Sequence, residues 1–364
     1  MIFSALSRIL PPPVWLTMPS MGVDISDTSL KYVSFEPTLK KNRTKKIEQW
    51  GEIPIPNGTV QRGQVQDPGQ LASVLKEFKL KTKAEFVTVS LPEERAYLFE
   101  TEIKRSTPLK EVKSLLEFRL EENVPIPSRD VLFDYAVLPG DEEKRSAQVV
   151  VAAYAKETIL KYYDACTEAG LRPTAFEVEA QAMSRSMVPQ SAEGAVMVVD
   201  FGQTRTGVGI VYKGMLLYTS TIDIGGDMLS KTLRQVLGAD TAEAELTRLK
   251  NTKGLVRGVD SSEVHDALIS TMSVIKDELA TRMQYWHVRN GNSEERRIKS
   301  VLMCGGSSNL RGLTDYMSEA LGVPSVRGNV WENTFPLTKT IPPIDRRHSY
   351  GYATAIGLAL SSLQ

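Results

Sequence analysis

Two segments, far apart in the sequence, each place an aspartate at the end of an apolar strand and just before a tight turn. Asp24 precedes the hydroxyl-rich turn at residues 26–29, and Asp200 precedes the turn Gly-Gln-Thr-Arg-Thr at residues 202–206. Backbone N–H groups and hydroxyls in such turns can form an anion-binding nest, and an aspartate beside it can hold Mg²⁺ through the metal's water shell. Either aspartate alone could be only a turn former. Two such turns can face each other, and together they predict a site for phosphate and metal.

Two further features could complete this site. Lys31 follows Asp24 closely enough to add a positive charge to a bound phosphate. Gly305 and Gly306 stand where an apolar strand at residues 301–304 runs into a helix, so a flat ligand could lie against bare backbone there. The same glycines could instead belong to an ordinary helix N-terminus that Ser308 or Asn309 caps.

The elements that must position these residues form a repeated pattern. The strand-turn-strand organisation of residues 21–36 recurs at residues 197–217. A chain of 364 residues also exceeds what one hydrophobic core usually supports. We therefore expect two lobes or more. Each repeat contributes one hairpin, and we expect these two hairpins to lie beside each other.

Residues 91–171 are typical of a small, self-contained α+β unit between the two repeats. Thr107 and Pro108 can serve as N-cap and first residue of a helix, and a later helix is expected at residues 157–170. Beyond the second repeat, residues 227–290 are mainly helical and residues 348–363 predict one closing helix. In the helix that begins at Thr107 and Pro108, the apolar stripe is expected to be Leu109, Val112, Leu116 and Leu120.

The composition excludes several classes of function. Lysine and arginine together number 44 and so do aspartate and glutamate, so no overall charge would attract nucleic acid or an anionic membrane. Two cysteines far apart and three scattered histidines suggest neither a disulfide framework nor a zinc site. No apolar run is long enough to span a membrane. We expect a cytoplasmic protein without a nucleic-acid partner.

The ordered set of motifs resembles the nucleotide-binding superfamily of actin, FtsA and DnaK, and within it the PilM family of type IV pilus assembly. The matching segments are GVDISDTSLK, VVDFGQTRTGVGIVYKGMLLYT and VLMCGGSSNLRGL, and residues 106–138 resemble the family's inserted subdomain. This resemblance implies an actin-like ATPase fold, an α/β fold of duplicated ribonuclease H-like lobes with an inserted α+β subdomain. The implied parts are an extension at residues 1–20, a first lobe at 21–90, 172–196 and 344–364, an insertion at 91–171, and a second lobe at 197–343.

The resemblance also implies roles for individual residues. ATP with Mg²⁺ would lie between the lobes, with Asp24 and Asp200 organising the metal through water. Glu179 resembles the acid that positions the attacking water in active members, although a helix N-terminal acid favoured by the helix dipole fits it equally. Glu243 resembles the ribose-contacting glutamate. The remaining implied contacts to ATP are Thr28, Ser29, Lys31, Gly202, Gln203, Thr204, Gly225, Gly226, Gly305, Gly306 and Ser307.

Two positions depart from the family pattern. Ser26 stands where glycine is usual, and Asp27 stands where a hydroxyl is common. An unpaired charge at Asp27 would weaken triphosphate binding. Alternatively, Asp27 points to solvent or joins the water shell of the metal. We therefore expect ATP binding with weak ATPase activity at most.

By the same resemblance, function rests on docking another protein rather than on releasing a product. The implied partner is a PilN-like inner-membrane protein whose N-terminal cytoplasmic tail binds between the first lobe and the insertion. Other pilus assembly components and self-association are further expected contacts. The protein would then work at the inner face of the cell membrane.

Other functions remain open from the sequence alone. An FtsA-like filament protein tethered to a membrane would need an amphipathic helix, for which residues 1–10 are a weak candidate, as they are for direct contact with lipid. A cytoplasmic scaffold of type II secretion is a further alternative. A sugar or acetate kinase of the same superfamily would need a substrate-deprotonating aspartate in the cleft, and no obvious one occurs.

Overall fold

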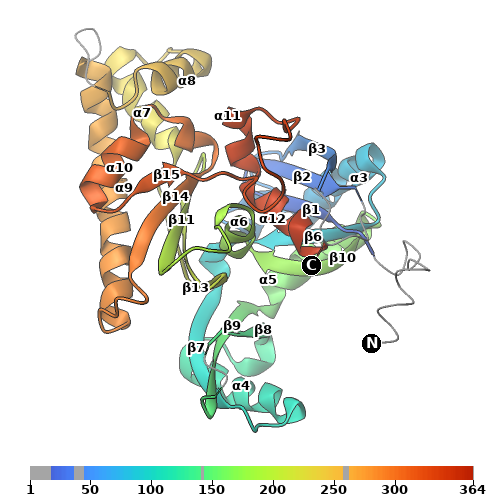
Figure 1. Cartoon of the computed structure of the whole chain (residues 1–364). Coiled ribbons are helices and arrows are strands. Elements are labelled where there is room, and N and C mark those ends of the chain that lie inside the picture. Colours follow the sequence, from blue (N-terminus) through green and yellow to red (C-terminus); the bar gives the residue numbers. More distant parts are fainter. Residues whose placement is uncertain (1–17, 37–44, 141–142, 257–261, 364) are drawn as a thin grey trace.

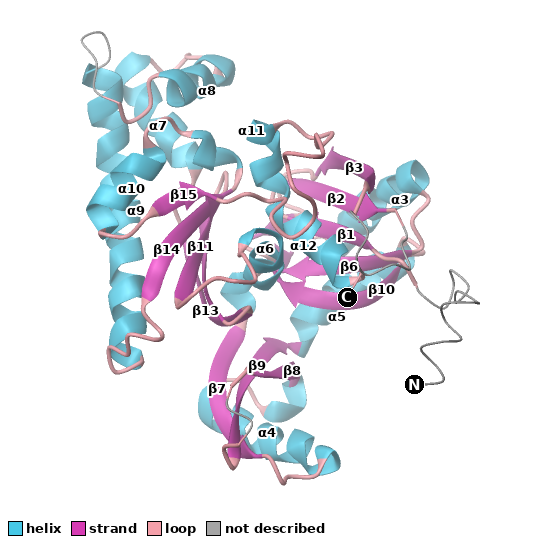
Figure 2. Cartoon of the chain, viewed as in Figure 1, coloured by secondary structure: helices cyan, strands magenta, loops and turns pink. Residues whose placement is uncertain are grey.

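A computed structural model describes residues 18–36, 45–140, 143–256 and 262–363. The helix considered at residues 1–10, and most of the extension at residues 1–20, lie outside these ranges. The described chain forms two five-stranded sheets beside each other, and a smaller three-stranded sheet extends away from both (Figure 1). Figure 2 shows that helices gather around the two large sheets and that one long helix flanks the smaller sheet.

The first large sheet has the strand order β10-β6-β1-β2-β3. The pairs β1–β2 and β2–β3 are antiparallel, whereas β6 pairs in parallel with β1 and with β10. Its α12 packs on β1 and β2, and α3 packs against α5. The strands are β1 Met21–Ile25, β2 Ser29–Phe35, β3 Ile47–Pro54, β6 Phe86–Leu91 and β10 Arg172–Val178; the helices are α3 Pro68–Thr82, α5 Lys156–Glu168 and α12 Ala353–Ser361.

The second large sheet repeats this topology with the order β13-β12-β11-β14-β15. Again three strands form an antiparallel meander, and two more join in parallel. The repeat of the hairpin that the sequence predicts is therefore confirmed. Its strands are β11 Ala195–Phe201, β12 Thr206–Tyr212, β13 Met215–Ile222, β14 Ile298–Cys304 and β15 Ser325–Arg327; its helices are α7 Gly226–Leu237, α8 Glu243–Thr252, α9 Ser262–Arg289 and α10 Leu313–Leu321.

The connection between the sheets is the short helix α6, Glu179–Met187, which contacts strands of both sheets and packs against α12. The two helices approach closely because Gly357 of α12 has no side chain: a Cβ there would lie 1.8 Å from the carbonyl oxygen of Ala182. Apolar residues of β11 are buried throughout, as expected for a strand inside a sheet that helices cover. These contacts fix the two hairpins next to each other.

The smaller sheet has the antiparallel order β7-β9-β8 and its own core with α4. Pro108 is the N-cap of α4, so this helix begins one residue later than predicted. Val112, Leu116 and Leu120 are buried as expected, but Leu109 is 83% exposed because it stands at the very start of the helix, ahead of the packed turns. The elements are β7 Tyr97–Lys104, α4 Leu109–Asn123, β8 Val131–Val137 and β9 Ser146–Ala155.

Helix α5 packs differently from the prediction that assigned residues 91–171 to the insertion. Its buried residues Tyr162, Ala165 and Cys166 belong to the core that contains β1 and β6. The apolar pattern of a helix shows that one face is buried, but not against which sheet. We propose that the insertion ends with β9 and that α5 is part of the first lobe.

The C-terminal stretch forms three short helices in place of the single one predicted at residues 348–363. Asp345 caps α11, Arg346–Ser349, by accepting hydrogen bonds from the backbone N–H groups of Arg347 and His348. A 3₁₀ turn at Tyr350–Tyr352 then leads into α12. The carbonyl of Tyr350 in this turn accepts a hydrogen bond from the N–H of Gly305 at 2.9 Å. The other short elements are β4 Val60–Gln61, β5 Gln64–Val65, η1 Glu93–Arg95, η2 Ser128–Asp130 and η3 Gly306–Asn309.

Candidate functional site

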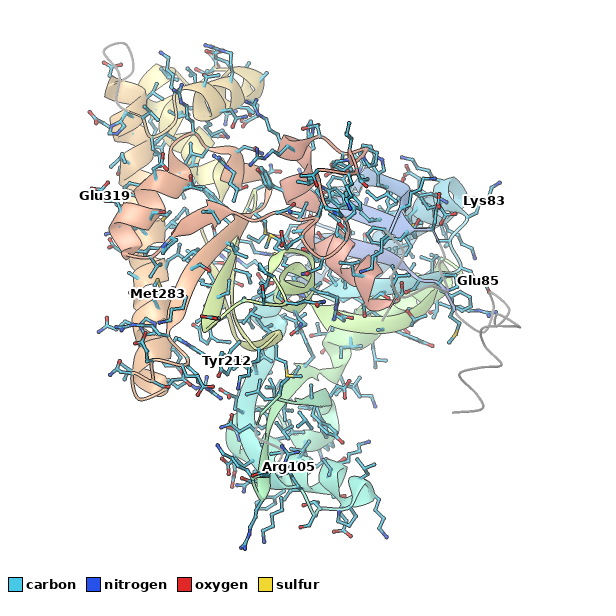
Figure 3. All side chains as sticks on the ribbon, in the orientation of Figure 1. Lys83, Glu85, Arg105, Tyr212, Met283 and Glu319 are labelled. Carbon is cyan, nitrogen blue, oxygen red and sulfur yellow. The ribbon has the colours of Figure 1, made fainter. Side chains whose placement is uncertain are left out.

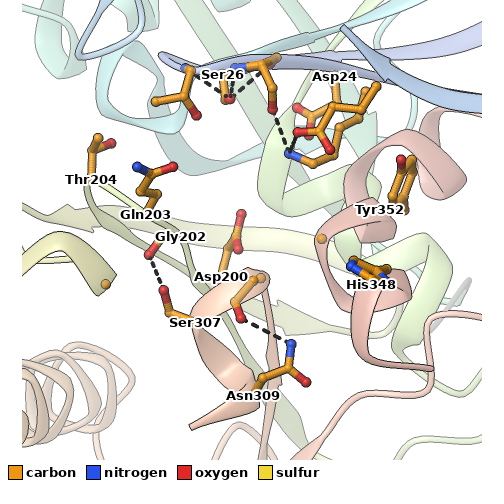
Figure 4. Close-up of a pocket in the computed structure, with 18 of the residues that line it drawn as sticks. Asp24, Ser26, Asp200, Gly202, Gln203, Thr204, Ser307, Asn309, His348 and Tyr352 are labelled. Carbon is orange, nitrogen blue, oxygen red and sulfur yellow. Dashed lines mark hydrogen bonds and ion pairs between the residues drawn. The ribbon is translucent and has the colours of Figure 1, made fainter. Parts of the chain in front are cut away.

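A cavity of about 1110 Å³ opens between the two large sheets, at the ends of their hairpins. Figure 4 shows Asp24 and Ser26 on one side of it and Asp200, Gly202 and Gln203 on the other. The structure thus brings together residues that are about half the chain apart. Those of the predicted site that line the cavity are Asp24, Thr28, Ser29, Lys31, Glu179, Asp200, Gly202, Gln203, Thr204, Gly226, Glu243, Gly305, Gly306 and Ser307.

Gly225 does not line the cavity but allows the second turn to rest on the start of α7. A Cβ at Gly225 would lie 2.3 Å from the carbonyl oxygen of Gln203. The N–H groups of Gly226 and Asp227 donate hydrogen bonds to the carbonyls of Gly202 and Gln203. The turn at residues 202–206 is therefore anchored to a helix N-terminus.

Ser26 is built into the first turn. Its Oγ accepts hydrogen bonds from the N–H groups of Thr28 and Ser29, at 3.4 and 3.1 Å, and donates to the carbonyl of Ser29 at 2.9 Å. The two amides are thereby paired within the turn, in a hydroxyl-closed geometry that glycine could not form. Thr28 and Ser29 also line the cavity.

Asp24 and Lys31 lie opposite each other in the register of β1 and β2. Burial raises the pKa of Asp24 above its usual value, while the charge of Lys31 and a hydrogen bond from Ser90 act against this rise. The ammonium of Lys31 lies 2.8 Å from the Oγ of Ser29 and 3.4 Å from Glu52. Lys31 therefore places a positive charge next to the first turn.

Gly305 lies directly behind Asp200. Its φ of 86° is in the left-handed region, and a Cβ would lie 2.2 Å from the Oδ1 of Asp200. A Cβ at Gly306 would meet no heavy atom within 4 Å, so the backbone there is open to the cavity. Ser307 closes the link by donating from its Oγ to the carbonyl of Gly202 at 2.9 Å. This arrangement supplies a flat, bare surface beside the second turn.

Three carboxyl groups lie buried in the floor of the cavity: Glu93, Glu179 and Asp200. Burial raises the pKa of Glu93 to about 8 and that of Asp200 to about 6. Burial, together with the neighbouring Glu93, raises the pKa of Glu179 well above its ordinary value. At neutral pH Glu93 therefore holds a proton that an exposed carboxyl group would lose, whereas Asp200 is mostly ionised.

Sequence reasoning missed Glu93, which is 3% exposed and has an Oε2 without a hydrogen-bond partner among the described residues. Its carboxylate occupies the space above Gly207 of β12, where a Cβ would lie 1.8 Å from the Oε1 of Glu93. The available signal was the acidic pair Glu93 and Glu94 directly after the buried strand β6. Nothing in the sequence shows that this pair turns toward the second hairpin.

Asp27 is paired with Arg205, an arrangement that was not among the alternatives left open by the sequence. The guanidinium of Arg205 donates to both of its carboxylate oxygens, at 3.1 and 3.0 Å, and lies 2.9 Å from Glu94. Burial lowers the pKa of Arg205, but the surrounding carboxylates outweigh it and raise the pKa above its usual range. The extra negative charge of the first turn is therefore neutralised by the second turn.

Glu243 lines the opposite end of the cavity, at the start of α8. It accepts hydrogen bonds from Ser230 at 2.8 Å and from Arg234 at 2.7 Å. Partial burial acts to raise the pKa of Glu243, but these hydrogen bonds and the charge of Lys250 lower it. Glu243 is thus an ionised acceptor held in a fixed position.

The residues present fit a nucleotide with a divalent cation. The buried carboxyl groups of Asp24 and Asp200 face the cavity from both hairpins. A cation there would favour their ionised forms, which burial disfavours. Within the described ranges, no group of three or more His, Cys, Asp or Glu side chains is arranged to hold a metal by itself. Such an ion would therefore need water or ligand oxygens to complete its coordination.

The family model for the type IV pilus assembly protein PilM matches residues 22–363. Among solved structures, a PilM-PilN type IV pilus biogenesis complex is 21% identical, with a TM-score of 0.76 over 95% of this chain and 99% of the other. The ethanolamine utilization protein EutJ from Carboxydothermus hydrogenoformans is 17% identical, with a TM-score of 0.50 over 96% and 90% of the two chains.

MreB5 of Spiroplasma citri, in a structure with bound ADP, is 11% identical, with a TM-score of 0.51 over 87% of this chain and 94% of the other. These likenesses confirm the predicted actin-like fold. Across the described ranges, no helix combines the length and the apolar character that crossing a membrane requires.

Proposed function

Because the chain belongs to the PilM family of type IV pilus assembly proteins, we propose that it binds ATP and Mg²⁺ between its two large sheets and thereby sets the geometry of a protein-docking surface. The observation that carries this proposal is the convergence of both hairpin turns and the open backbone at Gly306 on one cavity of about 1110 Å³. Function then rests on a shift between conformations of the lobes.

Each part of the cavity has a role in this proposal. The hydroxyls of Thr28 and Ser29, the ammonium of Lys31 and the turn at residues 202–204 contact the phosphates, while Gly306 and Glu243 face the nucleoside. Bound Mg²⁺ would neutralise phosphate charge, and Asp24 and Asp200 would hold it through its waters. Lys31 contributes a positive charge beside the first turn, whereas the guanidinium of Arg205 is committed to Asp27 and Glu94.

Hydrolysis is slow at most in this proposal. A general base must be ionised near the working pH to accept a proton. Burial and the nearby Glu93 raise the pKa of Glu179 well above its ordinary value, which disfavours the ionised form that a general base needs. The site therefore favours retention of the nucleotide over its turnover.

The proposed partner is a PilN-like inner-membrane protein, whose cytoplasmic N-terminal tail binds between the first lobe and the insertion at the inner face of the membrane. A matching structure is described as a PilM-PilN complex. A cavity of about 230 Å³ lies at that junction in this chain. An extended peptide could enter such a groove. Its walls include Gln64 and Val65 of β5, Tyr97 of β7, Ala155 at the end of β9, and Thr158 and Lys161 of α5.

Calorimetric titration of the protein with ATP and Mg²⁺ tests the nucleotide part of the proposal. Wild type should bind saturably, and Asp200→Ala should lose most of that binding because it removes a carboxylate from the floor of the cavity. Asp266→Ala is the matched control, since Asp266 is 73% exposed on α9 and lies outside the cavity. Absence of binding by wild type, or equal binding by Asp200→Ala, would contradict the proposal.

A further inference from the structure

The short turn η1, Glu93–Arg95, separates the nucleotide cavity from the groove beside the insertion. Glu93 lines the large cavity between the sheets, whereas Glu94 and Arg95 line the smaller cavity at the junction with the insertion. η1 also leads directly from β6 of the first sheet into β7 of the insertion. Successive residues of one turn thus face two separate cavities.

Arg205 links this turn to both hairpins of the nucleotide cavity. It belongs to the second hairpin turn, donates to Asp27 of the first at 3.0 Å, and lies 2.9 Å from Glu94 of η1. The three side chains are only 13–15% exposed. At this depth, a charged group that loses its partner is destabilised far more than it would be on the surface. The three segments are therefore held to one another.

The opposite wall of the groove is held by the same aspartate. Asp27 accepts hydrogen bonds from the N–H groups of Arg62 and Gly63, in the turn between β4 and β5. Gln64 and Val65, which follow at once, line the groove. Gly63 also lies against η1, because a Cβ there would meet Pro92 at 2.2 Å and the Oε1 of Glu94 at 2.9 Å. Both walls of the groove thus connect to the Asp27–Arg205 pair.

We propose that the buried cluster of Asp27, Glu94 and Arg205 couples nucleotide binding to the shape of the groove beside the insertion. Movement of one hairpin turn relative to the other must either carry η1 and the β4–β5 turn with it or separate buried opposite charges. Bound nucleotide would then change the affinity of the groove for an occupant by some factor. An occupant that displaces Glu94 would change the affinity for nucleotide by that same factor, because coupling between two sites is reciprocal. This inference rests on the proposed function of both cavities.

Hydrogen-exchange mass spectrometry on the whole chain, with and without ATP and Mg²⁺, measures this coupling without requiring the partner. In wild type, the nucleotide should change exchange of backbone amides at residues 93–97 and 62–65 by about fivefold or more, in line with usual coupling strengths. In Glu94→Gln, the amides of the hairpin turns should still respond, whereas the response at residues 93–97 should be lost. Calorimetry on the same samples reports whether nucleotide binds.

Glu100→Gln provides the matched control. Glu100 of β7 pairs with Arg296 at 2.8 Å, both are 15% exposed, and the pair also joins the insertion to the second lobe. It lies outside the nucleotide cavity, beside Tyr212, whose ring contacts Arg296. Figure 3 shows Tyr212 near the junction with the insertion and Arg105 toward its far end. This variant should respond to nucleotide as wild type does.

The outcomes distinguish a failure of nucleotide binding from a failure of the coupling alone. Failure of wild type to bind ATP would overturn the nucleotide function and the coupling with it. Binding without a response at residues 93–97, or an unchanged response in Glu94→Gln, would overturn the coupling alone. Loss of the response in Glu100→Gln as well would also overturn it, because any weakened contact with the insertion would then have the same effect.

Discussion

Gly305→Ala should destabilise the fold strongly, although it adds a single methyl group. The φ of 86° at Gly305 places an L-residue in left-handed backbone, which costs about 1–2 kcal/mol. The new Cβ would also lie 2.2 Å from the Oδ1 of Asp200 and 2.5 Å from the carbonyl oxygen of Phe201, and such overpacking costs about 1–3 kcal/mol. The expected loss in the free energy of unfolding is therefore about 2–5 kcal/mol.

Urea denaturation of Gly305→Ala and of the neighbouring variant Gly306→Ala measures this effect. A Cβ at Gly306 meets nothing within 4 Å, so stability should change by less than about 0.5 kcal/mol. The same methyl group would stand where we propose the nucleoside lies, and should weaken ATP binding in calorimetry. A loss below about 1 kcal/mol in Gly305→Ala, or equal losses in both variants, would refute the reasoning.

Three further predictions concern stability. Burial raises the pKa of Glu93 from 4.5 to about 8, so the folded state keeps a proton that the unfolded chain loses. Stability should therefore fall as pH rises through this window, and Glu93→Gln should flatten the fall in Tm between about pH 6 and about pH 8.5. Gly357→Ala should lose about 1–3 kcal/mol in urea denaturation, because its Cβ would lie 1.8 Å from the carbonyl oxygen of Ala182. Trp286→Ala should lose about 3–5 kcal/mol, since the indole is fully buried, whereas Tyr285→Ala, at 52% exposure, should lose far less by the same measurement.

The sequence could predict the features that local patterns encode. Asp24 and Asp200 each end an apolar strand before a polar turn, and the structure places both at the same cavity. Strand alternation and turn chemistry act over a few residues, so one sequence is enough to detect them. The repetition of one hairpin then predicts two similar lobes whose turns can face each other.

The features that the sequence could not predict depend on contacts between distant segments. Asp27 meets Arg205, 178 positions away, only because the two hairpins fold against each other. Glu94 joins them through η1, and the acidic pair in this turn does not show in the sequence which hairpin it faces. Burial by several segments likewise produces the raised pKa of Glu93. Helix α5 shows the same limit, since its apolar face did not reveal which sheet it covers.

The two hairpins differ in the residue that lies opposite the aspartate, and this difference removes the symmetry of the duplicated fold. Lys31 pairs with Asp24 in the first hairpin, whereas Gly207 pairs with Asp200 in the second and the carboxyl group of Glu93 fills the space above it. One half of the cleft therefore carries a cationic side chain at the position where the other half carries a buried, protonated carboxyl group. A ligand with an anionic end and a bound cation would meet two unequal faces, so it would bind in one direction rather than equally in either direction.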